Sequence, residues 1–138
     1  KMIINAENLI LGRLASFAAK KALLGQDIDI VNCEKAVITG KRVFILDKYK
    51  KRDERGDVYK GPFFYRKPDK FVKRAVRGML SYKKERGKNA FEKIRCYIGI
   101  PDKFKQAKLE TIKEANVSKT KSLNYMTVEK ISKHFLGK

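Results

Sequence analysis

The first thirty residues carry the pattern that restricts the fold most, because a strand, a helix and a second strand follow one another directly. Residues 2–4 are an apolar run that suits a strand, and apolar residues recur at helical spacing from Leu11 to Ala22. Gly25 then marks the helix end, and residues 27–32 (DIDIVN) have the pattern of a second strand. Strands joined in this way pair in parallel with a right-handed crossover, so the pattern predicts an α/β fold.

Two predicted helices lie in the middle of the chain. The first covers about residues 41–54, with Thr39 as its N-cap. The second starts near Pro68, because proline suits the first helical turn and Asp69 suits the positive helix N-terminus. Both helices are expected to keep one side in the core. For the second helix this side consists of Phe71, Val72, Ala75 and Met79.

The segments around these helices are expected to be a strand, two connections and a last helix. Residues 94–100 (IRCYIGI) alternate as a strand does, and a short helical turn is expected after Pro101. Residues 55–68 are rich in glycine, proline and aromatic residues and are expected to form a loop, and residues 109–125 an extended polar connection. The last helix has a cap at Thr127, an apolar face of Val128, Ile131 and Phe135, and a stop at Gly137.

The length and composition indicate one domain. A chain of 138 residues with 43% apolar residues can bury a core without a disulfide or a metal ion. We expect residues 1–108 to form an α/β core, and residues 109–138 a C-terminal extension of the same structural unit that ends in a short helix. Cys33 and Cys96 are far apart in the sequence and fit two buried thiols in a reducing compartment.

Positive charge is concentrated in the middle of the chain. The net charge is +19, of which residues 41–95 carry +13, against +1 for residues 1–40 and +5 for residues 96–138. Such a block repels itself unless a polyanion neutralises it, and nucleic acid is the commonest such partner. A membrane fits less well, because the sequence has neither a long basic amphipathic helix nor a membrane-spanning apolar run, and its N-terminal segment does not resemble a signal peptide.

The basic residues of this block fall into stripes at helical spacing, so that each middle helix presents a row of cations. The predicted stripes are Lys41, Lys48, Arg52 and Arg55, with Lys51 beside them, and Lys70, Lys73, Arg74 and Arg77. A basic loop is expected at residues 81–88. The pattern indicates binding to a polyanion and does not say which one.

Aromatic residues in the 55–68 loop have two possible roles. Rings in a basic loop can stack on unpaired bases, or they can fill the core beneath the loop. We expect Phe63 and Phe64 to fill the core, and we expect Tyr59, Tyr65 and Arg66 to be the better contact candidates.

Signals for catalysis are weak. The single histidine, His134, lies where a cation complements a helix dipole, and no zinc set or nucleophilic triad is recognisable. Gly12 is expected only to let the chain turn into its helix, because neither GxGxxG nor GxxxxGK[ST] is present. Acidic residues such as Asp47 and Asp53 are expected to cap helices or pair with nearby cations. No catalytic residue, metal or cofactor is therefore expected.

Four segments in order resemble the family of large-subunit ribosomal protein thirteen, in its archaeal and eukaryotic branch. The resemblance covers nearly the whole chain. At Ser81 it departs from the family's Arg-Gly-Met-Leu-Pro motif, because serine replaces the proline. The segments are NLILGRLAS (8–16), DIDIVNCEKAVITGKR (27–42), RAVRGMLSYKKERGKNAF (74–91) and RCYIGIP (95–101).

The resemblance implies a three-layer α/β/α fold around a small, mainly parallel sheet of about four strands, with a C-terminal helical extension. It also implies a structural, non-enzymatic constituent of the large ribosomal subunit that binds and stabilises ribosomal RNA and supports subunit assembly and translation. Its expected place is the cytoplasmic ribosome, beside other ribosomal proteins, without a membrane, cofactor or small-molecule substrate. The implied RNA contacts are Arg13, Lys41, Arg42, Lys48, Lys51, Arg52, Arg55, Arg66, Arg74, Arg77, Lys83, Lys84, Arg86 and Lys88, and the stripe at helical spacing adds Lys70 and Lys73.

Two other functions were weighed against the ribosomal one. A free nucleic-acid-binding or regulatory protein has the same chemistry, and only the series of motifs favours the ribosomal function over it. A nucleotide-dependent enzyme on a doubly wound fold is disfavoured by the missing glycine fingerprint and the missing acid–base set.

Overall fold

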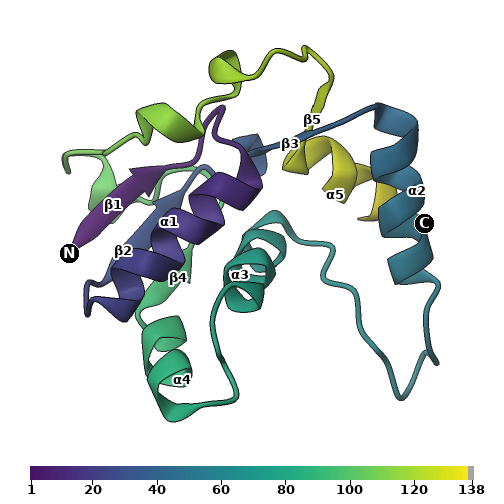
Figure 1. Ribbon diagram of the computed structural model, residues 1–138, viewed down its shortest axis with the longest axis horizontal. Helices are drawn as coiled ribbons and strands as arrows, with labels where there is room; N and C mark the ends of the chain where they lie inside the picture. Colours follow the sequence, from purple (N-terminus) through teal and green to yellow (C-terminus); the bar gives the residue numbers. More distant parts are fainter. Residues whose placement is uncertain (137–138) are drawn as a thin grey trace.

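The computed structural model describes residues 1–136 as a mixed α/β fold (Figure 1). A parallel sheet in the order β1–β2–β4 lies at its centre, and α1 connects β1 to β2, as the sequence pattern predicted. The sheet has three strands where about four were expected, and β3 and β5 form a separate antiparallel pair. The elements are β1 (Met2–Asn5), α1 (Leu11–Leu23), β2 (Ile28–Val31), β3 (Val37–Thr39), α2 (Arg42–Asp53), α3 (Pro68–Gly78), α4 (Glu85–Glu92), β4 (Ile94–Cys96), β5 (Tyr125–Thr127) and α5 (Val128–Leu136).

The core lies between the central sheet and the helices. Strand β2 is buried along its whole length, as a central strand of a parallel sheet should be, and α1 buries its predicted apolar face. The turn before α1 is made by Asn8, whose φ is +57°, and not by Gly12. Gly12 lies inside the first helical turn and needs no special conformation, so the role predicted for Gly12 is wrong.

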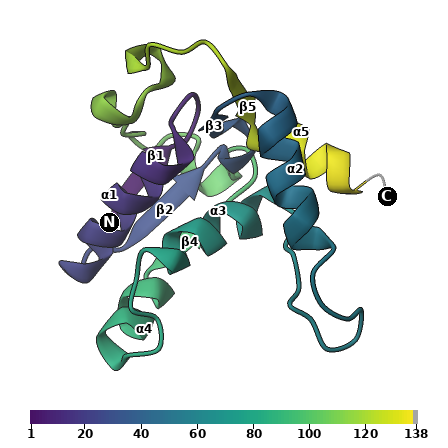
Figure 2. The same cartoon turned by 45° about the vertical axis from the view of Figure 1, so that its right-hand side comes forward.

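The N-cap of α2 lies two residues later than predicted. Thr39 is the last residue of β3, which pairs with β5, and Lys41 occupies the N-cap position of α2. The break comes from Gly40, which has a φ of +131° and donates its N–H to the Asn124 carbonyl at 2.8 Å. The loop predicted at 55–68 is present as residues 54–67, and its tip extends away from the other elements (Figure 2).

Helix α3 begins at the predicted proline, but its buried side differs from the prediction. Val76 is fully buried, whereas Met79 is 50% exposed. The helix ends at Gly78, so Met79 is its C-cap and the next turn carries Leu80 into the core. Periodicity alone continues the helix by one residue too many and therefore places the wrong side chain inside.

Residues 81–88 do not form one loop. The chain turns after α3 and starts α4 at Glu85, so Arg86 and Lys88 are helical residues. The helix fits there because Gly87 lies against the preceding turn, where a Cβ atom would be 2.1 Å from the carbonyl oxygen of Ser81. Gly87 is therefore a packing residue that permits close approach of two backbone segments.

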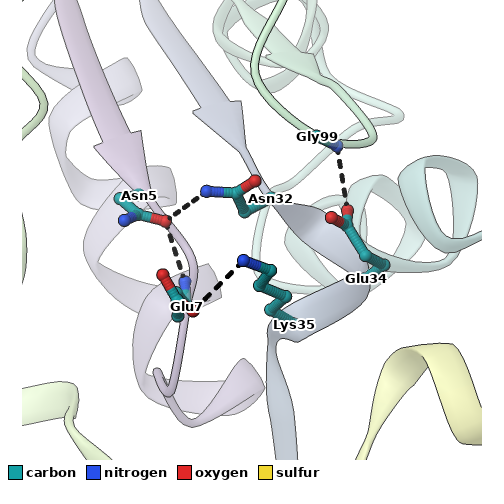
Figure 3. Close-up of polar contacts among 6 residues, drawn as sticks. All are labelled: Asn5, Glu7, Asn32, Glu34, Lys35 and Gly99. Carbon is teal, nitrogen blue, oxygen red and sulfur yellow. Dashed lines mark hydrogen bonds and ion pairs between the residues drawn. The ribbon is translucent and has the colours of Figure 1, made fainter.

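The predicted strand 94–100 ends at Cys96, because the chain then turns across the carboxyl ends of the central strands. Gly99 has a φ of +65°, accepts a hydrogen bond from the Asn32 backbone N–H at 3.0 Å and donates its own N–H to Glu34 at 3.0 Å. At the same edge the Asn32 side chain donates to the Asn5 side chain at 2.9 Å, and Lys35 pairs with Glu7 at 3.2 Å (Figure 3). These polar groups at the carboxyl edge of the sheet contact one another.

Residues 102–136 return to the N-terminal half of the chain. The expected helical turn after Pro101 is present as Asp102–Phe104, and the connection that follows contains short 3₁₀ turns. It is bonded to the first part of the chain, with the Glu110 N–H donating to Ile3 and the Ile10 N–H to Ala115, both at 2.8 Å. Thr127 accepts the Lys130 N–H, which confirms the predicted cap of α5, and the predicted apolar face of α5 is buried. The predicted stop at Gly137 lies outside the described residues.

Candidate nucleic-acid interface

The four predicted cations of α3 lie together on its outer side. Phe71, Val72 and Val76 anchor the opposite side in the core, and Asp69 lies in the first turn as expected. The cationic side lines a groove of about 260 Å³ together with two aromatic rings. The groove residues are Lys70, Lys73, Arg74 and Arg77, with Tyr65 and Phe91.

Aromatic rings hold three of these cations in place. Lys73 lies over Phe91 and Arg77 over Tyr82, each 5.0 Å from the ring centroid. Arg74 lies 5.6 Å from the centroid of Tyr65. Cation–π contacts at exposed sites contribute roughly 0.5–1 kcal/mol each, and they restrict long side chains without neutralising their charge. The α3 face is therefore a partly ordered row of positive charges.

Arg74 has a second role, which links α3 to the loop before it. Its Nη1 donates a hydrogen bond of 2.7 Å to the Phe63 carbonyl oxygen. Within that loop, Phe64 packs into the core, whereas its neighbour Phe63 is 60% exposed, so the prediction that both rings fill the core is right only for Phe64. Tyr65 is 39% exposed, in agreement with its selection as an accessible ring.

The predicted stripe on α2 lies on the solvent side of that helix. Ile45 and Tyr49 are its buried residues, and Lys48 and Arg52 are exposed. Arg52 lies 5.5 Å from the centroid of the Tyr49 ring. Burial raises the pKa of Tyr49 above its ordinary value, an effect that the nearby Arg52 partly opposes. Arg55 follows the helix and is exposed.

Two of the predicted contact residues are already paired with carboxylates. Lys51 forms an ion pair of 2.8 Å with Asp47, and this hydrogen bond raises the pKa of Lys51. Arg66 uses Nη2 to reach both oxygens of Asp53, at 3.2 and 3.3 Å. These pairs confirm that acidic residues of the basic block bind neighbouring cations. Arg66 holds the loop to α2, which leaves it less available to a ligand.

The remaining predicted residues lie on three separate parts of the surface. Arg13 is exposed on α1 and donates to the Glu114 carbonyl oxygen at 3.1 Å, while Lys41 and Arg42 are exposed at the start of α2. The last group is exposed on the turn before α4 and on α4 itself. It consists of Lys83, Lys84, Arg86 and Lys88.

Helix α3 is the centre of this arrangement. It lies between α2 and α4 in both views (Figures 1 and 2). The cation groups of α2 and α3 meet at a common cavity, which Arg52, Arg55 and Arg74 line. Arg13 and the α4 group line neither this cavity nor the α3 groove. The structure thus brings Arg52 and Arg55 of the α2 stripe beside Arg74 of the α3 stripe.

Sequence reasoning missed three aromatic residues of this surface. Phe63 was assigned to the core, and the contacts of Tyr82 and Phe91 with α3 cations were not foreseen. A ring that follows a basic helix by several residues is a weak signal, because the contact depends on the turn between α3 and α4. Only the crowding of rings and cations in residues 55–91 pointed to such contacts.

Other chemistry finds little support in the described residues. Residues 1–136 contain no group of three or more His, Cys, Asp or Glu side chains placed to hold a metal ion. Within the same residues, no helix combines the length and apolarity needed to cross a membrane. Cys33 and Cys96 are free thiols, of which Cys33 is buried and Cys96 half-buried, and the pKa of Cys33 is raised by its hydrogen bond with Cys96 and by burial.

Comparison with known proteins decides the family. Residues 1–103 match the family described as ribosomal protein L13. The chain belongs to the ribosomal protein L13 family. This result confirms the resemblance seen in the four sequence segments, and it describes a family of ribosomal proteins and not of enzymes.

Relatives of this L13-family chain are similar over nearly their whole length. The large ribosomal subunit protein uL13 of Methanopyrus kandleri is 45% identical over 94% of this chain and 83% of its own length. The protein of the same name from Archaeoglobus fulgidus is 41% identical over 96% of this chain and 85% of its own length. That from Methanosarcina barkeri is 43% identical over 94% of both. These archaeal relatives agree with the branch that the motifs indicated.

Proposed function

We propose that this protein is a structural constituent of the large ribosomal subunit that binds and stabilises its ribosomal RNA. The observation that carries the proposal is the α3 face, where four cations lie on one side of a helix whose other side is fixed in the core. Family membership and the name shared by the relatives point to the ribosome as the place where this surface is used.

The charge balance supports RNA as the ligand. Of the sixteen predicted contact residues, only Lys51 and Arg66 form ion pairs with carboxylates among residues 1–136. The others keep an uncompensated positive charge, and the phosphates of an RNA chain would neutralise it with release of counterions. Lysine and arginine contacts to phosphate give affinity and position without reading the base sequence.

The same surface leads to a proposal for the protein's role in the subunit. Cations of α2 and α3 line a common cavity, whereas those around α4 are exposed on another part of the surface, so the two groups can hold RNA segments that are distant in sequence. We propose that this supports subunit assembly and translation, next to neighbouring ribosomal proteins in the cytoplasm. The proposal requires neither a cofactor nor a small-molecule substrate.

The test removes two α3 charges that have no structural hydrogen bond. In the double variant Lys70→Gln and Arg77→Gln, the loop anchor through Arg74 stays intact. Binding to purified large-subunit ribosomal RNA is measured by filter retention over a range of salt concentrations. The control is Lys108→Gln with Lys121→Gln, which removes two exposed charges outside the proposed surface.

We expect the α3 variant to bind more weakly and to show a smaller salt dependence. Two lost phosphate contacts lower the slope of log K against log salt by roughly 1.4–1.8, since each contact contributes about 0.7–0.9. The control variant keeps the slope and the affinity. An α3 variant that binds like the wild type would mean that this face is only solvated, and equal affinity for unrelated RNA would favour a free nucleic-acid-binding protein.

A further inference from the structure

A cavity of about 350 Å³ opens between α2, the loop of residues 54–67 and α3. This volume lies within the range of roughly 300–1,000 Å³ that is usual for sites of small ligands. Its lining combines packed aromatic rings, two accessible rings and three arginines. Electrostatic contacts alone do not require such a combination, because phosphate binding needs cations and not rings.

The inner part of the cavity is a rigid aromatic cluster. Tyr49 and Phe71 have ring centroids 5.1 Å apart, and Phe64 lies 6.0 Å from Tyr49 and 6.1 Å from Phe71. Phe64 also contacts the ring of Phe135 on α5, at 5.4 Å. These rings have partners in the core, so they stay in place and form a firm apolar floor.

The outer ring, Phe63, lines the cavity although it is 60% exposed. Its carbonyl oxygen accepts the hydrogen bond from Arg74, and its ring lies beside Gly61, where a Cβ atom would be 3.2 Å from two ring carbons. An exposed phenylalanine held in this way presents an apolar face that water solvates poorly. A flat ligand can stack on it.

The rim of the cavity supplies positive charge. Arg52, Arg55 and Arg74 line the cavity, and arginine can both bind phosphate with two bonds and stack on a planar ring. Tyr49, which is 8% exposed, lies at the floor, and Arg52 lies 5.5 Å from the centroid of its ring.

We infer that this cavity receives one unpaired nucleotide of the bound RNA, with its base against Phe63 and its phosphate at the arginines. The inference rests on the proposed function. A paired base in a duplex is stacked on both faces and cannot enter, so the site selects a nucleotide from a loop or a bulge. Stacking on an aromatic ring tolerates every base, so the site is expected to recognise an unpaired base and not a particular sequence.

The test uses base-specific chemical probing of purified large-subunit ribosomal RNA, alone and in complex with the protein. Phe63→Ala removes the stacking ring. Gly78→Leu places a side chain at the cavity edge, where a Cβ atom meets nothing within 4 Å, so the fold can accept it. The matched control is Phe44→Ala, which removes a ring that is 70% exposed on α2 and does not line the cavity. Circular dichroism checks that each variant is folded.

We expect the wild type to protect at least one unpaired base, which becomes reactive again in the Phe63→Ala and Gly78→Leu complexes. The affinity of Phe63→Ala for the RNA falls roughly 5- to 150-fold, the range of one base–aromatic stacking contact, while Phe44→Ala behaves like the wild type. A complex that forms with the same protections in all variants would overturn the cavity inference and leave RNA binding intact. Absence of any complex with the wild type would overturn both.

Discussion

Replacing Gly87 by alanine should destabilise the protein, although alanine is the better helix former. Gly87 is in α4, and a Cβ atom there would lie 2.1 Å from the carbonyl oxygen and 2.4 Å from the carbonyl carbon of Ser81. Ordinary contacts of a Cβ atom begin at 3.4 Å, so α4 and the preceding turn must move apart by about 1.3 Å, the difference between 3.4 and 2.1 Å. Both atoms belong to the backbone, which cannot move aside as a flexible side chain does.

The magnitude follows from two opposing effects. Overpacking of this kind costs about 1–3 kcal/mol, and the gain in helix propensity offsets about 0.5–1 kcal/mol of it. Because both clashing atoms belong to the backbone, the overpacking cost lies near the top of its range, and the free energy of unfolding should fall by about 2 kcal/mol. Gly12 lies in the first turn of α1, and a Cβ atom there meets nothing within 4 Å. Gly12→Ala should therefore raise the free energy of unfolding by about 0.5–1 kcal/mol.

Urea unfolding followed by circular dichroism measures both variants under the same conditions. A lower free energy of unfolding in Gly87→Ala and a higher one in Gly12→Ala would support the close approach of α4 to the turn at Ser81. Because this contact orients Lys83, Lys84, Arg86 and Lys88, the Gly87 variant should also bind ribosomal RNA more weakly. Stabilisation by alanine at both positions would refute the packing role of Gly87.

The other predictions concern the buried side of α3 and the ring of Tyr49. Val76→Asp places a carboxylate at a fully buried position and should lower the free energy of unfolding by about 4 kcal/mol or more. Met79→Asp, at a half-exposed position, should change it by about 0.5 kcal/mol or less. Thermal melts that show equal losses of stability in the two variants would contradict the position of the helix end. The pKa of Tyr49 is raised in the folded state, so its contribution to stability is complete below the ordinary value of about 10 and is lost as the pH rises through the folded-state value. Urea unfolding between pH 8 and about 11.5 should show that Tyr49→Phe loses less stability with rising pH than the wild type does. Identical losses of stability in the two proteins would mean that Tyr49 is not the source of the alkaline effect.

The parts of the fold that periodicity controls could be predicted from the sequence. The apolar faces of α1 and α5 repeat with the helical period, and they are buried as predicted. The end of α3 could not be predicted, because the choice between Val76 and Met79 depends on where the chain leaves the helix. Helix α4 was missed because it has eight residues and buries only Gly87 and Ala90, which gives no apolar period.

In the candidate site, too, helical spacing could be predicted from the sequence, whereas contacts between distant residues could not. The stripe from Lys70 to Arg77 follows from helical spacing, and the structure places these cations on one groove. Phe63 and Phe64 are identical neighbours, and only tertiary contacts decide that Phe64 packs into the core while Phe63 faces the cavity. The ion pair of Arg66 with Asp53 joins the loop to a helix, and no spacing rule predicts it.

The most direct measurement of the central claim is the sedimentation of the native protein from a lysate of its own cells. In a sucrose gradient with magnesium at low salt, the account predicts that the protein sediments with the large ribosomal subunit. High salt should release it, because the phosphate contacts of its lysines and arginines weaken as salt increases. Recovery of the protein only in the free soluble fraction at low salt would contradict the ribosomal function.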